Sequence, residues 1–202
     1  MSRNHNHLLG IALSINLPNF ITLGRVFSVP FVFWLLLSGQ AKAAFVLFVL
    51  AGVSDAVDGF LAKRFQMQTA LGAYLDPLAD KLLIVSIYIA LGAREQLPLW
   101  LVIAVVSRDL AILAGFVLAW MLNHPAEVKP MLVSKLNTTA QIVLAAVVLA
   151  DEGFLIGLDT LRWALAWLTG TLTMASLASY SRAWFAHMTQ PPQATLGGKV
   201  QS

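Results

Sequence analysis

Four aspartates lie close together in a chain that otherwise contains few charged residues. They are Asp55, Asp58, Asp76 and Asp80, within the stretch DAVDGFLAKRFQMQTALGAYLDPLAD. On helices, spacings of three and four residues place both members of each pair on one face. Carboxylate oxygens are hard ligands that suit Mg²⁺ or Mn²⁺, and two such ions about 4 Å apart serve phosphoryl chemistry. The spacing therefore predicts a divalent-cation site, and we expect it to hold two ions.

The surrounding composition indicates an integral membrane protein. Of the 202 residues, 58% are hydrophobic and only 11% are charged, whereas a soluble domain averages about 25% charged residues. On insertion scales each aspartate within a bilayer costs about 2.5–3.5 kcal/mol. Lys81 alone cannot neutralise four of them, but divalent cations can. The alternatives are four hydrogen-bonded acids in a polar cavity, or an ion or proton pathway.

Apolar segments of membrane-spanning length recur along the chain and predict an all-α protein with six transmembrane helices. The expected spans are residues 20–37, 43–61, 70–93, 98–122, 135–150 and 161–185. Polar or Pro/Gly-containing connectors separate them. The connector between the second and third spans is so short that we expect a tight helical hairpin. This hairpin would bring the two aspartate pairs together near one membrane face.

The domain organisation follows from these spans. We expect an N-terminal segment over residues 1–19, a six-helix domain over 20–186 and a disordered tail over 187–202. The N-terminal segment is either an interfacial helix or a loose tail, and it lacks the pattern of a cleaved signal peptide. The absence of cysteine excludes disulfides and thiolate metal sites. A net charge of +3 without a Lys/Arg run argues against a nucleic-acid partner.

The placement of lysine and arginine predicts that both termini are cytoplasmic. In that orientation eight of the 13 basic residues lie inside, three lie outside, and Lys81 and Arg108 fall within spans. The inside residues are Arg3, Arg25, Lys63, Arg64, Lys129, Lys135, Arg182 and Lys199. Because cytoplasmic loops are enriched in Lys and Arg, we expect the aspartates to open to the cytoplasm.

Small residues accompany the aspartates. Gly59, Ala62 and Gly72 form a stripe that would allow helices to pack closely in a bilayer. Beside four carboxylates, the same stripe leaves room for a phosphorylated ligand to approach the backbone. The two interpretations are compatible.

This region resembles the signature of the CDP-alcohol phosphatidyltransferase family, DxxDGxxAR followed after eight residues by GxxxDxxxD. The matching residues are Asp55, Asp58, Gly59, Ala62, Gly72, Asp76 and Asp80, with Lys63 where the family usually has arginine. The opening LPNFITLGRV and the six spans are also similar to the family. The stretches VSRDL and SKLNTTAQ look most like eukaryotic-type cardiolipin synthases, which bacteria also have. Phosphatidylglycerophosphate synthases tend to carry lysine at Asn137 and glutamate at Asp109.

The resemblance implies transfer of a phosphatidyl group from CDP-diacylglycerol to a glycerol-type acceptor, with release of CMP. It favours phosphatidylglycerol as the acceptor, with glycerol 3-phosphate as the alternative. It implies that the four aspartates bind magnesium or manganese and that Asp80 also takes the proton of the acceptor hydroxyl. The residues expected on the nucleotide side are Gly59, Ala62, Lys63, Gly72, Asn19 and Thr22. Lys63 carries its charge on one ammonium group. The arginine that is usual in the family has a planar guanidinium group, which can bind a phosphate through two nitrogen atoms.

The acceptor side needs positive charge, because glycerol-type acceptors carry a phosphate. Arg108 lies near the middle of a predicted span, where a charge is a functional hypothesis by default. Its alternative is a structural pair with Asp109, although neighbouring residues on a helix point about 100° apart. Lys135, at the start of the fifth span, either contacts the acceptor or extends to lipid headgroups. Asn137 completes the expected acceptor-binding residues.

By analogy with the family we also expect membrane lipids as partners, a homodimer, and a location in a bacterial inner membrane. The competing class is a small ion or proton transporter. A transporter often shows acidic residues across the membrane depth and two similar halves. Here the acidic residues cluster near one face and no second half carries them, which favours the enzyme.

Overall fold

The computed structural model describes residues 17–65, 70–121 and 132–188, and this part of the chain is helical throughout except for short turns. The helices are α1 (Leu17–Leu37), α2 (Ala41–Phe65), α3 (Ala70–Ala93), α4 (Leu99–Met121), α5 (Leu132–Phe154) and α6 (Asp159–Met188). Each predicted span corresponds to one of these helices. The predicted N-terminal interfacial segment lies largely outside the described residues, and the predicted C-terminal tail almost entirely so.

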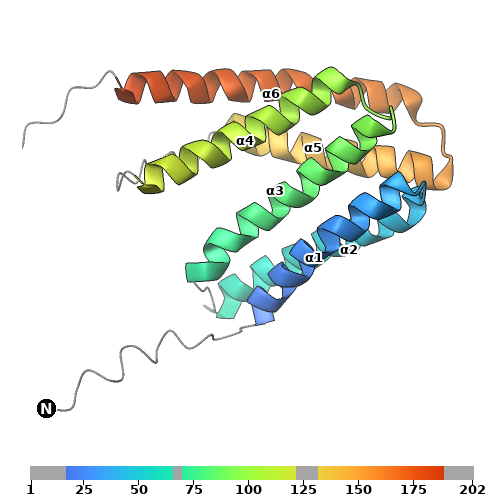
Figure 1. The fold of residues 1–202 in the computed structure, drawn as a ribbon, viewed down its shortest axis with the longest axis horizontal. Helices are drawn as coiled ribbons and strands as arrows, with labels where there is room; N and C mark the ends of the chain where they lie inside the picture. The colour runs from blue at the N-terminus through green and yellow to red at the C-terminus, as the bar shows by residue number, and fades with distance from the viewer. Residues whose placement is uncertain (1–16, 66–69, 122–131, 189–202) are drawn as a thin grey trace, which may run out of the picture.

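The helices run in alternating directions (Figure 1). The three described connectors, after α1, α3 and α5, lie at one end of the molecule, and the first residues of α1 and the last of α6 lie at the other. Glycines permit two of these turns, since Gly39 and Gly157 have positive φ angles of 75° and 82°. Gly39 and Gly157 lie two and three residues after the ends of α1 and α5, and glycine adopts this left-handed conformation without steric cost.

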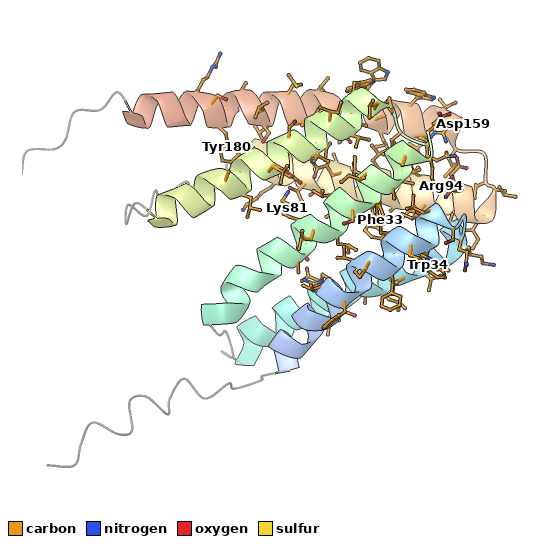
Figure 2. All side chains as sticks on the ribbon, in the orientation of Figure 1. Phe33, Trp34, Lys81, Arg94, Asp159 and Tyr180 are labelled. Carbon is orange, nitrogen blue, oxygen red and sulfur yellow. The ribbon has the colours of Figure 1, made fainter. Side chains whose placement is uncertain are left out.

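Polar contacts join the connectors at this end. Arg94, after α3, pairs with Glu152 of α5 at 2.9 Å. Arg162 of α6 donates a hydrogen bond at 3.0 Å to Gln96, in the turn between α3 and α4. Figure 2 shows Arg94 and Asp159 at this end, remote from the helix ends where the chain begins and finishes. The end with the connectors is therefore held by side chains from several turns.

Helix α1 lies between α2 and α3. It packs against both, and in the described part of the chain no Cα atom of α2 comes within 8 Å of one of α3. Val32 and Leu36 of α1 are fully buried in the resulting core. Along the described residues α2 and α3 are therefore separated by α1, and the predicted tight hairpin, whose connector lies outside the described residues, stays a prediction.

The outer surface is apolar and the interior holds polar groups. Phe27, Phe31 and Trp34 recur on one face of α1 and are 67%, 62% and 58% exposed. By contrast, Arg25 and Arg108 are buried. Exposed apolar surface of this extent is typical of proteins that contact lipid or a partner. It agrees with the predicted membrane location.

One described helix, Leu132–Phe154, combines the length and hydropathy of a membrane span, with a mean hydropathy of 1.6 in its most apolar window. A shorter apolar stretch, Gly24–Leu37, forms most of α1. The structure thus confirms the all-helical class and the helix order. The six-span topology and the cytoplasmic termini stay predictions.

Close packing of α2 on α5 depends on a glycine. A Cβ atom added at Gly153 would lie 2.8 Å from the Cα atom of Lys42, and this backbone cannot swing aside. We expect Gly153→Ala to lower the free energy of unfolding in detergent by about 1–3 kcal/mol, the usual cost of overpacking. Gly52→Ala is the matched control, because a Cβ atom there meets nothing within 4 Å. Equal unfolding midpoints for the two variants would contradict the packing described.

Candidate active site

Two of the four predicted aspartates meet around a buried arginine. Asp55 on α2 and Asp80 on α3 face Arg25 on α1. The Nη2 atom of Arg25 lies 2.6 Å from Oδ1 of Asp55, and its Nη1 atom donates a hydrogen bond at 2.8 Å to Oδ1 of Asp80. Because α1 lies between α2 and α3, its guanidinium group can reach a carboxylate on each side. We call this group the Arg25 bridge.

In the Arg25 bridge the two carboxylates are accessible to solvent, whereas the arginine is buried. The side chain of Arg25 is 3% exposed, whereas those of Asp55 and Asp80 are 43% and 48% exposed. Two half-exposed carboxylates from different helices are hard oxygen donors that suit a divalent cation. The site therefore fits Mg²⁺ or Mn²⁺ in the chemistry of its donors.

The other two predicted metal ligands belong to the same helices. Asp58 lies one turn after Asp55 on α2, and Asp76 lies one turn before Asp80 on α3. Their side chains fall outside the described residues. In the part of the chain that is described, no group of three or more His, Cys, Asp or Glu side chains gathers. The four-aspartate ligand set stays a prediction. Two of its members, Asp55 and Asp80, lie together in the structure.

The residues predicted for the nucleotide side lie on the same three helices. Asn19 and Thr22 belong to the first turns of α1, Gly72 lies near the start of α3, and Gly59, Ala62 and Lys63 lie on α2. The structure describes their helices but not their side chains. Their contact with a nucleotide therefore stays a prediction.

Arg25 was not among the predicted site residues. From the sequence, Arg25 is expected only as one of the basic residues on the cytoplasmic side, in the family-like stretch LPNFITLGRV. In the structure Arg25 is buried within α1 and paired with two carboxylates. The cytoplasmic orientation of the termini stays a prediction.

A second charged cluster surrounds Arg108 on α4, and we call it the Arg108 cluster. The Nη1 atom of Arg108 lies 2.6 Å from Oδ1 of Asp109, and the same oxygen accepts a hydrogen bond from Nζ of Lys81 at 2.9 Å. Arg108 also donates to the hydroxyl groups of Ser134 on α5 and Ser176 on α6. The pairing with Asp109, proposed as the alternative role of Arg108, is thus present.

The two clusters are joined through consecutive residues of α3. Asp80 reaches α1, while Lys81 reaches α4, in accord with the turn of about 100° between neighbours on a helix. In Figure 2, Lys81 lies between α3 and α4, and Tyr180 of α6 lies on the other side of α4. The ring of Tyr180 is 5.9 Å from Cζ of Arg108. Helix α3 therefore fixes the Arg25 bridge and the Arg108 cluster relative to each other.

The remaining predicted acceptor residues lie on α5, with different surroundings. Lys135 is exposed in the first turn of the helix. Asn137 is fully buried, and its Oδ1 atom accepts a hydrogen bond from Thr173 of α6 at 2.9 Å. The structure places Asn137 between two helices, one turn from Ser134. Contact of either residue with an acceptor is untested and stays a prediction.

The match to known families decides the assignment. Residues 15–201 match the family described as CDP-alcohol phosphatidyltransferase. The chain belongs to that family. The resemblance carried by the aspartate signature is thereby confirmed, and so is the enzyme class at the level of the family.

Curated members of the family include relatives named for two different activities. The chain is 36% identical to the chloroplastic CDP-diacylglycerol–glycerol-3-phosphate 3-phosphatidyltransferase 1 of Oryza sativa, over 82% of this chain and 56% of the relative. It is 34% identical to the CMP-forming cardiolipin synthase of Rattus norvegicus, over 81% of this chain and 60% of the relative. With the CDP-diacylglycerol–glycerol-3-phosphate 3-phosphatidyltransferase of Shigella flexneri it shares 34% identity, over 85% of this chain and 96% of the relative.

The chain therefore spans roughly a third to three fifths of the length of the eukaryotic relatives, and nearly all of the bacterial ones. Both named activities occur at similar identity. The comparisons thus establish the family and leave the acceptor open.

Proposed function

We propose that the protein transfers the phosphatidyl group of CDP-diacylglycerol to the hydroxyl group of a glycerol-type acceptor and releases CMP. The observation that carries this function is the convergence of Asp55 and Asp80 on Arg25 in a chain of this family. The aspartate positions are those of the family signature, and two of them lie together although 25 residues separate them in sequence. Family membership also favours this enzyme over the ion-transport alternative.

Asp55, Asp58, Asp76 and Asp80 would hold two magnesium or manganese ions. When bound, such ions stabilise the negative charge that develops on the pyrophosphate and on the departing CMP. Asp55 and Asp80 present half-exposed oxygen atoms for this role. Gly59, Ala62 and Gly72 leave room on the same helices for the nucleotide, and Lys63 supplies a positive charge there.

Asp80 serves as the general base. The oxygen of the acceptor hydroxyl bonds to the phosphorus of the phosphatidyl group, the bond from that phosphorus to the CMP oxygen breaks, and the hydroxyl proton passes to Asp80. A base must reach the proton that it takes. The carboxylate of Asp80 is 48% exposed and held by Arg25 at 2.8 Å, so it is both accessible and fixed.

We propose phosphatidylglycerol as the acceptor, which makes the enzyme a cardiolipin synthase. Asn137 and Asp109 differ from the residues that phosphatidylglycerophosphate synthases tend to carry. The Arg108 cluster supports the same acceptor, because two cations share one carboxylate and leave a single positive charge. A phosphodiester carries one negative charge, whereas a phosphate monoester carries about 1.5–2 at neutral pH.

Glycerol 3-phosphate is the second candidate acceptor. The bacterial relatives that match this chain over 92–96% of their own length are named for that acceptor. In either case the phosphatidyl donor, CDP-diacylglycerol, is a lipid. We therefore propose a multi-pass protein of a bacterial inner membrane, with the site facing the cytoplasm and a homodimer as the functional unit.

A competition between the two acceptors tests this assignment. Purified protein in detergent is given CDP-diacylglycerol, Mn²⁺, phosphatidylglycerol and glycerol 3-phosphate together, and the lipid products are separated by chromatography. We expect cardiolipin as the main product, with CMP formed in equal amount. Phosphatidylglycerophosphate as the main product would move the assignment to the second candidate, and CMP without either lipid would contradict both.

A further inference from the structure

Arg25 of α1 pairs with carboxylates on two other helices. It is the buried member of a group whose two carboxylates are about half exposed. It binds one oxygen of each, on two helices whose described Cα atoms do not come within 8 Å of each other. Those two helices carry the four signature aspartates. Arg25 is thus the described side chain that spans both halves of the site.

The guanidinium group is suited to this bridge. Its planar fork offers two parallel N–H directions, and hydrogen bonds between charged groups are shorter and stronger than neutral ones. A lysine would bring the same charge as a single point, which cannot fix two carboxylates in one plane. The positive charge also offsets the repulsion between Asp55 and Asp80.

The position of Arg25 is set by the carboxylates. Its Nε atom is buried and has no hydrogen-bond partner among the described residues, although both Nη atoms are paired. A buried donor without a partner is unfavourable. The side chain therefore gives up one donor to reach both carboxylates. Apolar residues such as Val32 and Leu36 already pack α1 into the core, so the buried charge is not needed merely to associate the helices.

We propose that Arg25 is a positioning residue, whose fork fixes Asp55 and Asp80 relative to each other so that their open sides face the substrate and the cations. The proposal rests on the proposed function for what the two carboxylates do once they are placed. The fork itself acts before any ligand binds. It can therefore be tested without substrate.

The first test is a double-mutant cycle in EDTA. Thermal unfolding in detergent is compared for wild type, Arg25→Met, Asp55→Ala, which removes the acceptor oxygen atoms, and the double variant. If the fork couples the helices, the double variant loses less stability than the two single losses together, because Asp55 no longer needs a partner. Additive losses would overturn the proposal, whatever the activity. If Arg25→Met does not fold, Arg25→Lys replaces it in the same cycle.

The second test uses Arg25→Lys, which keeps the charge and removes the fork. Binding of Mn²⁺ is measured by electron paramagnetic resonance, and kcat and KM are measured from CMP release. We expect Mn²⁺ affinity to fall by about 10–100-fold, as for residues that orient metal ligands, and kcat/KM to fall by about 100-fold, as for small misplacements. Arg182→Lys, on an exposed position of α6, is the control.

Each outcome separates the two proposals. Arg25→Lys with wild-type Mn²⁺ affinity and wild-type kcat/KM would overturn the positioning role. If the wild-type protein releases no CMP but the double-mutant cycle in EDTA shows coupling, the proposed function is wrong. The positioning role of Arg25 is then retained.

Discussion

Asp80→Asn is expected to lower the rate of CMP release by about 10²–10⁴-fold, the contribution of a general base. Asparagine has the same shape as aspartate but cannot accept the hydroxyl proton. Its side-chain oxygen can still accept the hydrogen bond from Arg25, so the helices should stay assembled. The rate is measured with CDP-diacylglycerol, Mn²⁺ and phosphatidylglycerol at saturating concentrations.

The control for Asp80→Asn is Glu95→Gln, which removes a carboxylate from the connector at the opposite end of α3. Glu95 is exposed and remote from Asp80. Glu95→Gln should release CMP at the wild-type rate, and both variants should unfold close to the wild-type midpoint. Near-normal turnover by Asp80→Asn would rule out its role as the base. A large fall in its midpoint would instead assign a structural role.

Asp109→Leu is expected to destabilise the protein by about 3–5 kcal/mol, the cost of leaving buried charge unpaired. One oxygen of Asp109 faces both Arg108 at 2.6 Å and Lys81 at 2.9 Å. The side chain of Arg108 is only 1% exposed, so it cannot reach water for compensation. The free energy of unfolding is measured with denaturant in detergent.

Two further variants identify the cause. Removing both charges, in Arg108→Met with Asp109→Leu, should recover much of the lost stability, because apolar residues often replace a buried ion pair without loss. Asp159→Asn removes a carboxylate that pairs with Arg162 on the surface and is 73% exposed, and should cost less than about 1 kcal/mol. A double variant less stable than Asp109→Leu would show that the charges of the cluster contribute independently.

The helices and the aspartate site were predictable because their signals are local. Runs of apolar residues fix where a helix can lie in a bilayer, and polar turns separate them. Spacings of three and four residues fix which aspartates share a face. The structure has a helix for each predicted span and places Asp55 and Asp80 together.

The position of α1 was not predictable in the same way. A connector of a few residues suggested that α2 and α3 pack together, but chain proximity does not exclude a third helix between them. Because lipid is as apolar as the core, hydrophobicity gives little information on which helix faces pack in a membrane. Arg25 was missed for this reason, since its partners are 30 and 55 residues away in sequence.

The pairing of Arg108 with Asp109 shows a limit of helical geometry as a guide. Neighbouring residues do leave the helix about 100° apart, which argued against a pair. The long side chain of Arg108 nevertheless bends back to Asp109, and Ser134 and Ser176 fix its other nitrogen atoms. Those serines come from two other helices, and no spacing in the sequence identified them.

We propose that Asp55 and Asp80 belong to a metal-dependent phosphatidyltransferase site. The most direct test of this proposal is CMP release by purified wild type and Asp80→Asn in parallel, with CDP-diacylglycerol, both acceptors, and either Mn²⁺ or EDTA. We expect release by wild type with Mn²⁺ only, and little release by Asp80→Asn under either condition. No release by a folded wild-type protein, or equal release by both proteins, would contradict it.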